Sequence, residues 1–383
     1  QSVQNHLQSN LGYDDQLGGI RNPVLKEELQ KRIAKNPGKT VLIEFLIYIQ
    51  KQQKYFSGAF VQSRALDKRL GESGHRVYEL ARICVENSDW ETAKRCYAYL
   101  LEKGPNSVYF DVASIEGLNV EFLALTQTAR PSDEEMVVLE GKLKRAYTKY
   151  RHLTLSYQLL KNLVQVQAYY LSMNHEAIAM LVEFIEQPGI NAQVKAEFKL
   201  LLGDLYLVSG AIWDASLLYS QVEKDFKYET IGQDAKFRNA RLSYFAGDFT
   251  WAKAQCDVLK GATSKLIAND ALDLSLVITD AIGVDTNAAP LRMFASAELL
   301  ILQRSYDEAI RKMDSINLLF DTHTLGDDIY FKKAKIYLAT GDYGKVETMY
   351  QKILEFYPAD LYGDDAQFLL AELYDKKLSN REK

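Results

Sequence analysis

The chain has 383 residues, of which 47% are hydrophobic and 25% are charged, values close to the average of globular proteins. Its formal net charge of -5 argues against nucleic acid as the main partner, because nucleic-acid-binding surfaces are rich in clustered lysine and arginine. The sequence contains no run of about 18 uncharged apolar residues, so no membrane-spanning helix is expected.

Residues 1–38 are predicted to form a polar segment followed by a first helix. The chain begins at Gln1, and its start shows no charged stretch followed by an apolar stretch, so no intact signal peptide is recognisable. Removal of a leader would place the protein in the periplasm or cell envelope, which we favour. A cytoplasmic location stays open.

Residues 39–260 are predicted to form repeated helix hairpins. In the copies that lie further along the chain, a small residue recurs every 37 positions, at Ala297, Ala334 and Ala371. In most copies the small residue is followed by an aromatic residue, such as Tyr337 or Tyr374, and the better copies add a turn such as Gly247-Asp248-Phe249 or Gly341-Asp342-Tyr343. We call the first helix of each pair helix A and the second helix B.

The pattern has a simple physical basis. Small residues in the middle of helices A and B let the two backbones approach closely, and the neighbouring aromatic rings fill the space beside that contact. Glycine supplies the left-handed conformation that ends helix A, and the aspartate after it is expected to cap helix B. One hairpin cannot bury its apolar side alone, so successive pairs must stack.

Three segments depart from the repeat. Residues 107–157 fit it poorly, although Ser132 and Glu135 are expected to form a capping box at a helix start. Residues 261–289 are predicted to hold an inserted helix and a loop. Residues 290–383 return to the repeat, but the last copy has a helix A and almost no helix B, so we expect a longer array or a further contact of its last helix. The pairs are expected to begin near residues 39, 74, 111, 158, 196, 233, 290, 327 and 364.

The pattern resembles the tetratricopeptide repeat, in which a small residue lies in helix A, glycine precedes an aromatic residue at the turn, alanine recurs in helix B and proline follows at the exit. Pro105 and Pro358 match that proline. The resemblance implies an all-α fold, a right-handed superhelix of about eight to nine hairpins with one inserted helix. The joint 357–366 also resembles those of periplasmic repeat proteins from bacterial cell envelopes, such as the outer-membrane assembly lipoproteins.

The resemblance further implies that helices A line a concave face that binds partners. The first partner-facing position falls on Tyr78, Phe237, Phe294, Phe331 and Phe368, and the next on Arg82, Arg241, Glu298, Lys335 and Glu372, with Asp204 in the copy that starts at Leu200. Core packing is the competing interpretation for the aromatic residues, and solvent contact or internal ion pairs for the charged ones. Because the charged row alternates in sign, we do not expect the family's clamp for acidic chaperone tails.

No chemical motif is recognisable. The five histidines form no metal-binding pattern, the three cysteines contain no CxxC pair and are expected to be buried free thiols, and Lys39 ends an incomplete P-loop. The paired carboxylates Asp327-Asp328 and Asp364-Asp365 recur at the joints and are interpreted as helix caps. We therefore expect no catalytic residue, no metal and no cofactor.

Two functions from different classes follow. The first is a scaffold that binds a protein or peptide partner in its helical groove, in a bacterial cell-envelope assembly. The second is a structural or oligomerisation module that packs onto a further domain or subunit through its terminal helices, with self-association through the incomplete last repeat.

Overall fold

The computed structural model describes residues 18–36, 38–127, 131–283, 287–320 and 323–376. All regular secondary structure in these ranges is α-helical. The helices are α2 (Gly18–Lys35), α3 (Thr40–Gln52), α4 (Phe56–Leu70), α5 (His75–Glu86), α6 (Trp90–Glu102), α7 (Phe110–Gln127), α8 (Asp133–Tyr150), α9 (Ser156–Tyr169), α10 (Asn174–Glu186), α11 (Ala192–Val208), α12 (Ile212–Asp225), α13 (Thr230–Phe245), α14 (Phe249–Leu259), α15 (Lys265–Gly283), α16 (Ala289–Leu302), α17 (Tyr306–Leu319), α18 (Gly326–Thr340), α19 (Tyr343–Phe356) and α20 (Gly363–Lys376). None of these helices combines the length and apolar character needed to cross a bilayer.

Helices pack mainly on their neighbours in the chain, as a hairpin array requires. Helices A begin at residues 40, 75, 110, 156, 192, 230, 289, 326 and 363, each within four residues of the expected start. Helix α15 is the predicted inserted helix, and α20 is a last helix A. The expectation of an all-α hairpin array with one inserted helix is thus confirmed, whereas residues 1–17 of the predicted polar segment lie outside the described part.

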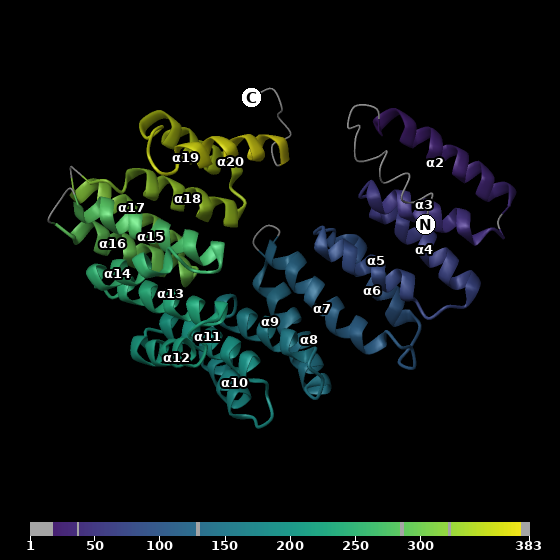
Figure 1. Ribbon diagram of the computed structural model, residues 1–383, viewed down its shortest axis with the longest axis horizontal. Helices are drawn as coiled ribbons and strands as arrows, with labels where there is room; N and C mark the ends of the chain where they lie inside the picture. The colour runs from purple at the N-terminus through teal and green to yellow at the C-terminus, as the bar shows by residue number, and fades with distance from the viewer. Residues whose placement is uncertain (1–17, 37, 128–130, 284–286, 321–322, 377–383) are drawn as a thin grey trace. The chain divides into compact units, whose positions relative to one another are not determined.

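The helices form two compact units. Unit 1 comprises residues 1–127 and 141–162, and unit 2 comprises residues 128–140 and 163–383. In Figure 1 the helices of each unit follow one another in chain order. Each unit has its own buried core, with α5, α6 and α7 contributing to the first and α13, α16 and α17 to the second.

The turn chemistry predicted from the sequence is present at the A–B turns. Gly247 and Gly341 have φ angles of 83° and 77°, which a side chain would disfavour. The carboxylate of Asp248 accepts a hydrogen bond from the backbone N–H of Trp251 at 3.1 Å, and Asp342 accepts one from Lys345 at 3.2 Å. These contacts satisfy N–H groups that the start of helix B leaves without a helical partner.

The close approach of helices A and B is visible at Gly203 in α11. A Cβ atom on this residue would lie 2.4 Å from the ring of Tyr219 in α12. A larger residue at this position would therefore clash with the tyrosine ring. The same pairing of small and aromatic residues was the signal that predicted the repeat.

The capping box predicted at the start of α8 is confirmed. The backbone N–H of Ser132 donates to the carboxylate of Glu135 at 2.9 Å, and the N–H of Glu135 donates to the Ser132 hydroxyl at 3.2 Å. The two contacts give hydrogen-bond partners to backbone N–H groups that would otherwise have none at the start of the helix.

The joint aspartates Asp327 and Asp328, which were predicted to cap a helix, differ from each other in the structure. Helix α18 begins at Gly326, so both residues lie within its first turn. Burial raises the pKa of the Asp327 carboxyl, and hydrogen bonds from the backbone N–H groups of Asp327 and Asp328 oppose that rise, whereas the Oδ1 of Asp328 has no partner among the described groups. The backbone of Gly326 lies directly against Tyr357, since a Cβ atom on this residue would be 2.2 Å from the phenol oxygen. Both aspartates are buried, at 5% and 6% exposure.

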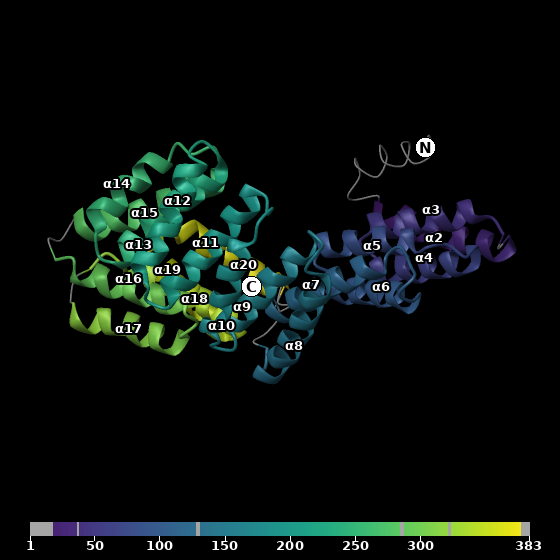
Figure 2. The ribbon, with the colours of Figure 1, turned by 90° about the horizontal axis from the view of Figure 1, so that it is seen from below.

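Two contacts link turns that are far apart in the sequence of unit 2. Beyond the end of α16, the side-chain amide of Gln303 donates to the carbonyl of Val208 at 2.9 Å, 95 residues earlier. Arg304 donates to the hydroxyl of Tyr170 at 2.7 Å, 134 residues earlier, and its guanidinium lies 3.9 Å from the centre of that ring. Figure 2 shows α16 beside α13, and the two helices are in contact. The α16–α17 turn thereby reaches the ends of α9 and α11.

Candidate protein-binding groove in unit 2

Two adjoining cavities lie on the side of unit 2 that helices A form. The first, here called the arginine cavity, has a volume of about 470 Å³, and the second, the lysine cavity, about 340 Å³. They share Phe237, Arg241 and Asp270 as lining residues, so they lie next to one another, and we call the two together the groove. Their walls come from α9, α11, α13, α15, α16, α18 and α20, from the α16–α17 turn and from the joint before α20, and two helices B contribute Tyr219 of α12 and Tyr306 of α17.

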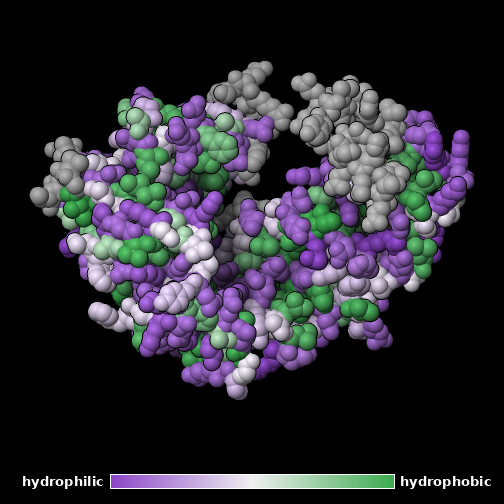
Figure 3. Space-filling model, viewed as in Figure 1, coloured by the Kyte–Doolittle hydropathy of each residue, from purple (hydrophilic) through white to green (hydrophobic). Residues whose placement is uncertain are grey.

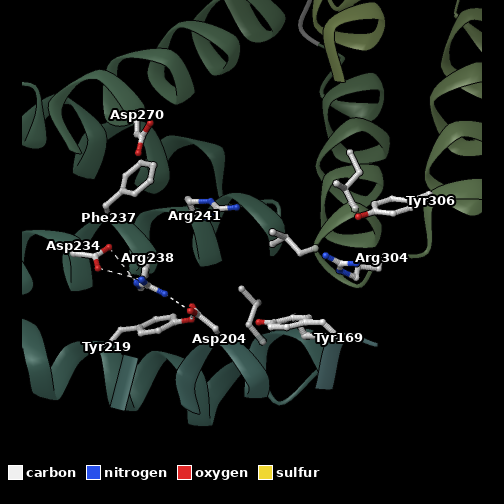
Figure 4. Close-up of a pocket in the computed structure, with 14 residues that line it drawn as sticks. Tyr169, Asp204, Tyr219, Asp234, Phe237, Arg238, Arg241, Asp270, Arg304 and Tyr306 are labelled. Atoms are coloured by element: carbon white, nitrogen blue, oxygen red, sulfur yellow. Dashed lines mark hydrogen bonds and ion pairs between the residues drawn. The ribbon is translucent and has the colours of Figure 1, made fainter. Parts of the chain in front are cut away.

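An ion-paired triad forms one wall of the arginine cavity (Figure 4). Arg238 bridges Asp204 of α11 and Asp234 of its own helix α13, with its Nε 3.1 Å from Asp234. Asp204 also accepts a hydrogen bond from the hydroxyl of Tyr219 at 2.8 Å. Burial opposes the charge on Arg238, but the two carboxylates outweigh burial and hold the pKa of its guanidinium above the ordinary value.

Other side chains around the cavity carry unused hydrogen-bond donors. Figure 4 shows the guanidinium of Arg241 directed into the cavity from α13, and the side chains of Arg304 and Tyr306 directed into it from the facing turn. Tyr169, at the end of α9, also lines the cavity. Burial, followed by the charge of Asp204, raises the pKa of Tyr169 to about 12, so its hydroxyl keeps its proton at neutral pH.

The lysine cavity is lined by charges of both signs on an aromatic wall. Glu298 of α16 lies 2.5 Å from the ammonium of Lys332 and accepts a hydrogen bond from Tyr244 at 2.7 Å. Burial raises the pKa of this carboxyl, but Lys332 and Tyr244 outweigh burial and hold the pKa below its ordinary value. Lys335 lies over the ring of Phe331 at 4.5 Å, and burial, followed by the charge of Lys332, lowers the pKa of its ammonium.

Six of the eleven residues predicted from the sequence line the groove: Asp204, Phe237, Arg241, Glu298, Phe331 and Lys335. The five predicted aromatic residues do not form one exposed row. Phe294 is fully buried in the core of unit 2, and Phe331, 4% exposed, is stacked on Tyr362 with ring centroids 4.0 Å apart. Phe368 is 69% exposed, and Glu372 is half-buried; neither lines the two cavities.

The two predicted residues of unit 1 lie near a separate cavity of about 280 Å³. Arg82 lines this cavity together with Glu116, and it lies 3.8 Å from Glu79. Tyr78 is half-buried, stacks on Tyr109 at 4.9 Å and donates a hydrogen bond to Glu116 at 3.2 Å. Tyr78 therefore supports the wall of the cavity through Glu116.

Sequence reasoning missed several residues of the groove: Tyr169, Arg238, Lys332, Arg304 and Tyr306. A signal existed for Arg238, because Asp234 precedes it by one helical turn on the same face. No comparable signal marked Arg304 or Tyr306, because Arg304 lies in a turn outside the helical periodicity and Tyr306 is the first residue of a helix B. Within the described ranges, no group of histidine, cysteine and acidic side chains is arranged to hold a metal ion.

No family model matches the sequence, and no curated protein matches it. Solved structures of tetratricopeptide repeat proteins are similar to this chain, at low identity. One is a tetratricopeptide repeat protein from Parabacteroides merdae, with 12% identity, a TM-score of 0.40, and 78% of this chain and 97% of that chain covered. Another is Naa15/Naa10 bound to HypK-THB, with 11% identity, a TM-score of 0.24, and 95% of this chain and 61% of that chain covered.

Proposed function

We propose that the protein is a protein-binding scaffold and that the groove of unit 2 holds an extended segment of its partner. The observation that carries this proposal is that the arginine and lysine cavities adjoin, with Phe237, Arg241 and Asp270 lining both. Each cavity has the volume typical of a ligand pocket, and together they offer successive pockets along one face. Successive pockets suit a chain with several side chains better than one small molecule.

The character of the lining supports a polypeptide ligand. The aromatic residues Phe237, Tyr244 and Phe331 line the lysine cavity together with charged groups of both signs. A peptide presents the same mixture of apolar side chains, backbone amides and charges, and aromatic residues with arginine are enriched where proteins bind one another. Figure 3 shows, on the face that it draws, apolar residues in separate patches among hydrophilic ones. On that face, the surface does not present one broad apolar band.

Site-specific photo-crosslinking tests the proposal. A photoreactive amino acid replaces Lys335, which is exposed and lines the groove, in cells that make the protein. The control carries the same residue at Leu318 of α17, which is 82% exposed and lies outside both cavities. We expect adducts from the groove position that map to one short segment of each captured protein. Equal adducts from both positions, or none from the groove, would contradict the proposal.

The oligomerisation alternative is favoured by one observation on the last helix. Phe368 of α20 is 69% exposed, and Leu361 and Phe356 nearby are 41% and 59% exposed. An apolar surface of this kind is common where proteins associate. Sedimentation analysis over a range of concentrations tests it: self-association that Phe368→Ser abolishes would support the alternative, and a concentration-independent monomer would remove it.

We infer a bacterial envelope setting from a single feature, the joint 357–366 and its resemblance to periplasmic repeat proteins. In the structure this joint holds Tyr362, which stacks on Phe331 and so fixes α20 against α18. Fractionation of the source cells, followed by detection with an antibody, tests the setting. Recovery in the cytosolic fraction alone would contradict it.

A further inference from the structure

We infer that Cys84 and Cys96 are a redox-active pair, which forms a disulfide across the α5–α6 hairpin under oxidising conditions. This inference goes beyond the proposed function and does not depend on the groove of unit 2. In the structure both thiols are free, each residue is 0% exposed, and the two thiols are hydrogen-bonded to one another. Both belong to the core cluster of unit 1, whereas Cys256 belongs to another cluster, in unit 2.

The hairpin pattern places the two sulfur atoms on facing sides of the pair of helices. Cys84 lies three positions after the small residue Ala81, where a later copy has Tyr337. Cys96 lies three positions after Ala93, the small residue of helix B. A thiol is much smaller than a phenol ring, so this replacement leaves room beside Cys84 for a second sulfur in a closely packed core.

The packing around the pair suits a covalent link. A disulfide requires two Cα atoms that are about 4.4–6.8 Å apart. Ala81 and Ala93 are 0% exposed and lie one helical turn from the cysteines, so their small side chains let α5 and α6 approach closely at this level. Because the thiols are already in contact, the bond requires a shift of two side chains and no rearrangement of the hairpin.

The reaction is a thiol–disulfide exchange in which a small disulfide, such as oxidised glutathione, is the oxidant. One cysteine loses its proton, and its thiolate attacks a sulfur of oxidised glutathione, which breaks that S–S bond and releases one glutathione thiolate. The second cysteine then loses its proton and attacks the cysteine sulfur of the mixed disulfide, which releases the second glutathione. Two cysteine thiols are oxidised, one glutathione disulfide is reduced, and the two released thiolates take up the two protons.

Burial determines when the exchange can take place. The hydrogen bond to Cys84, followed by burial, raises the pKa of the Cys96 thiol above its ordinary value, so this thiol keeps its proton at neutral pH in the folded chain. The thiolate is the reactive form, and neither sulfur is accessible to a small disulfide. The bond therefore forms while the chain folds or when the hairpin opens locally, and the folded core then protects it from reduction.

The bond would also fix one wall of the cavity in unit 1. Val85 and Glu86 directly follow Cys84, Tyr97 directly follows Cys96, and all three of these residues line that cavity. A link between the cysteines would hold the two parts of this wall at a constant separation. Disulfides persist in oxidising compartments and are reduced in the cytosol, so the compartment would set the rigidity of the wall.

Redox titration of the full-length chain tests the inference. Reduced protein is equilibrated with mixtures of oxidised and reduced glutathione, in native buffer with a catalytic amount of a disulfide isomerase and, separately, in concentrated urea. Free thiols are then alkylated, and the protein is digested with trypsin. The disulfide joins the peptide 83–94 to the peptide 96–103, and mass spectrometry measures the linked fraction.

The comparison of the two titrations decides the outcome. If the fold holds the sulfurs together, the folded chain must be oxidised more readily than the unfolded one, because the fold and the bond stabilise each other reciprocally. We expect half-oxidation in native buffer at a ratio of oxidised to squared reduced glutathione that is at least about tenfold lower than in urea. An equal or higher ratio in native buffer, which includes the absence of the linked peptide, would overturn the inference.

A matched substitution controls for burial alone. Cys256 is also 0% exposed, and burial raises the pKa of its thiol to about 11, but it lies in a different cluster from the pair. Cys256→Ala should therefore keep the difference between the two titrations, with circular dichroism as the check that the variant is folded. The peptide map of the natural chain identifies the bond directly, so the test does not depend on variants of Cys84 or Cys96. A native disulfide that joins Cys256 to either of them would overturn the pairing.

Discussion

The burial of Asp328 has a measurable effect on stability. The residue is 6% exposed in the first turn of α18, and its Oδ1 has no hydrogen-bond partner among the described groups. Burial, followed by the neighbouring charge of Asp327, raises the pKa of its carboxyl to about 8. Lys332 would lower this pKa, but its ammonium is bonded to Glu298. Asp328→Asn replaces the protonated acid by a neutral group of the same shape.

The sign of the effect follows from proton binding. The carboxyl titrates near 3.8 in the unfolded chain and near 8 in the folded one, so between these values the folded state holds a proton that the unfolded state has lost. The free energy of unfolding therefore falls as pH rises from about 4 to about 8 and levels off above. At 1.36 kcal/mol per pH unit, the loss reaches up to about 5 kcal/mol. In the Asp328→Asn variant, the free energy of unfolding does not decrease in this way, because the amide does not titrate.

Urea unfolding followed by circular dichroism measures the difference. We expect Asp328→Asn and the natural chain to have similar free energies of unfolding near pH 4, and the variant to be the more stable by several kcal/mol near pH 8. Asp365→Asn is the control, because Asp365 holds the same place in α20 and is exposed. A difference between Asp328→Asn and the natural chain that stays constant across this pH range would refute the reasoning.

Three further predictions concern packing. Phe331→Ala should lower the free energy of unfolding by about 3–5 kcal/mol, because the ring of Phe331 is buried against Tyr362. Phe368→Ala should change it by less than about 0.5 kcal/mol, because Phe368 is exposed. Similar losses for the two variants in urea titrations would contradict the assignment of Phe331 as buried and Phe368 as exposed. Gly203→Ala should destabilise by about 1–3 kcal/mol through its clash with a tyrosine ring, and Gly141→Ala, with only the flexible end of an arginine at 3.5 Å, should stabilise by up to about 1 kcal/mol; thermal melts measure both. The three buried cysteines should react with the thiol reagent DTNB only after denaturant is added, and prompt labelling of the native protein would exclude their burial.

The hairpin array could be predicted because its signal is local and repeated. Small residues, aromatic residues and turn glycines recur with one spacing, and the contact between Gly203 and Tyr219 shows what that pattern encodes. The burial of individual aromatic residues could not be predicted in this way. Phe294 and Phe368 hold the same place in helix A, but Phe294 packs in one cluster with Val277 and Ile278 of the inserted helix α15. Helix α20 has no following helix within the described residues, so Phe368 stays exposed.

The residues of the candidate site also fall into those that could be predicted from the local pattern and those that could not. Phe237 and Arg241 could be placed in the groove from the helical register alone, because helices A face it. Arg304 and Tyr306 could not, because their position depends on how several hairpins together bring a turn back to α9 and α11. The path of the hairpin array that brings these parts together is set by many successive packing contacts, and no short pattern in the sequence specifies it.

The hydrogen bonds from Gln303 to Val208 and from Arg304 to Tyr170 alter how unit 2 is expected to unfold. In an ordinary repeat array each module depends only on the next, so such proteins can fray from an end one module at a time. Here, modules separated by 95 residues hold one another in place. Loss of α16 would therefore release α9 and α11 as well, so the block between them should melt in a single cooperative step. Because its long-range contacts must form before that block is stable, we also expect it to fold more slowly than an array of equal length with neighbour contacts alone.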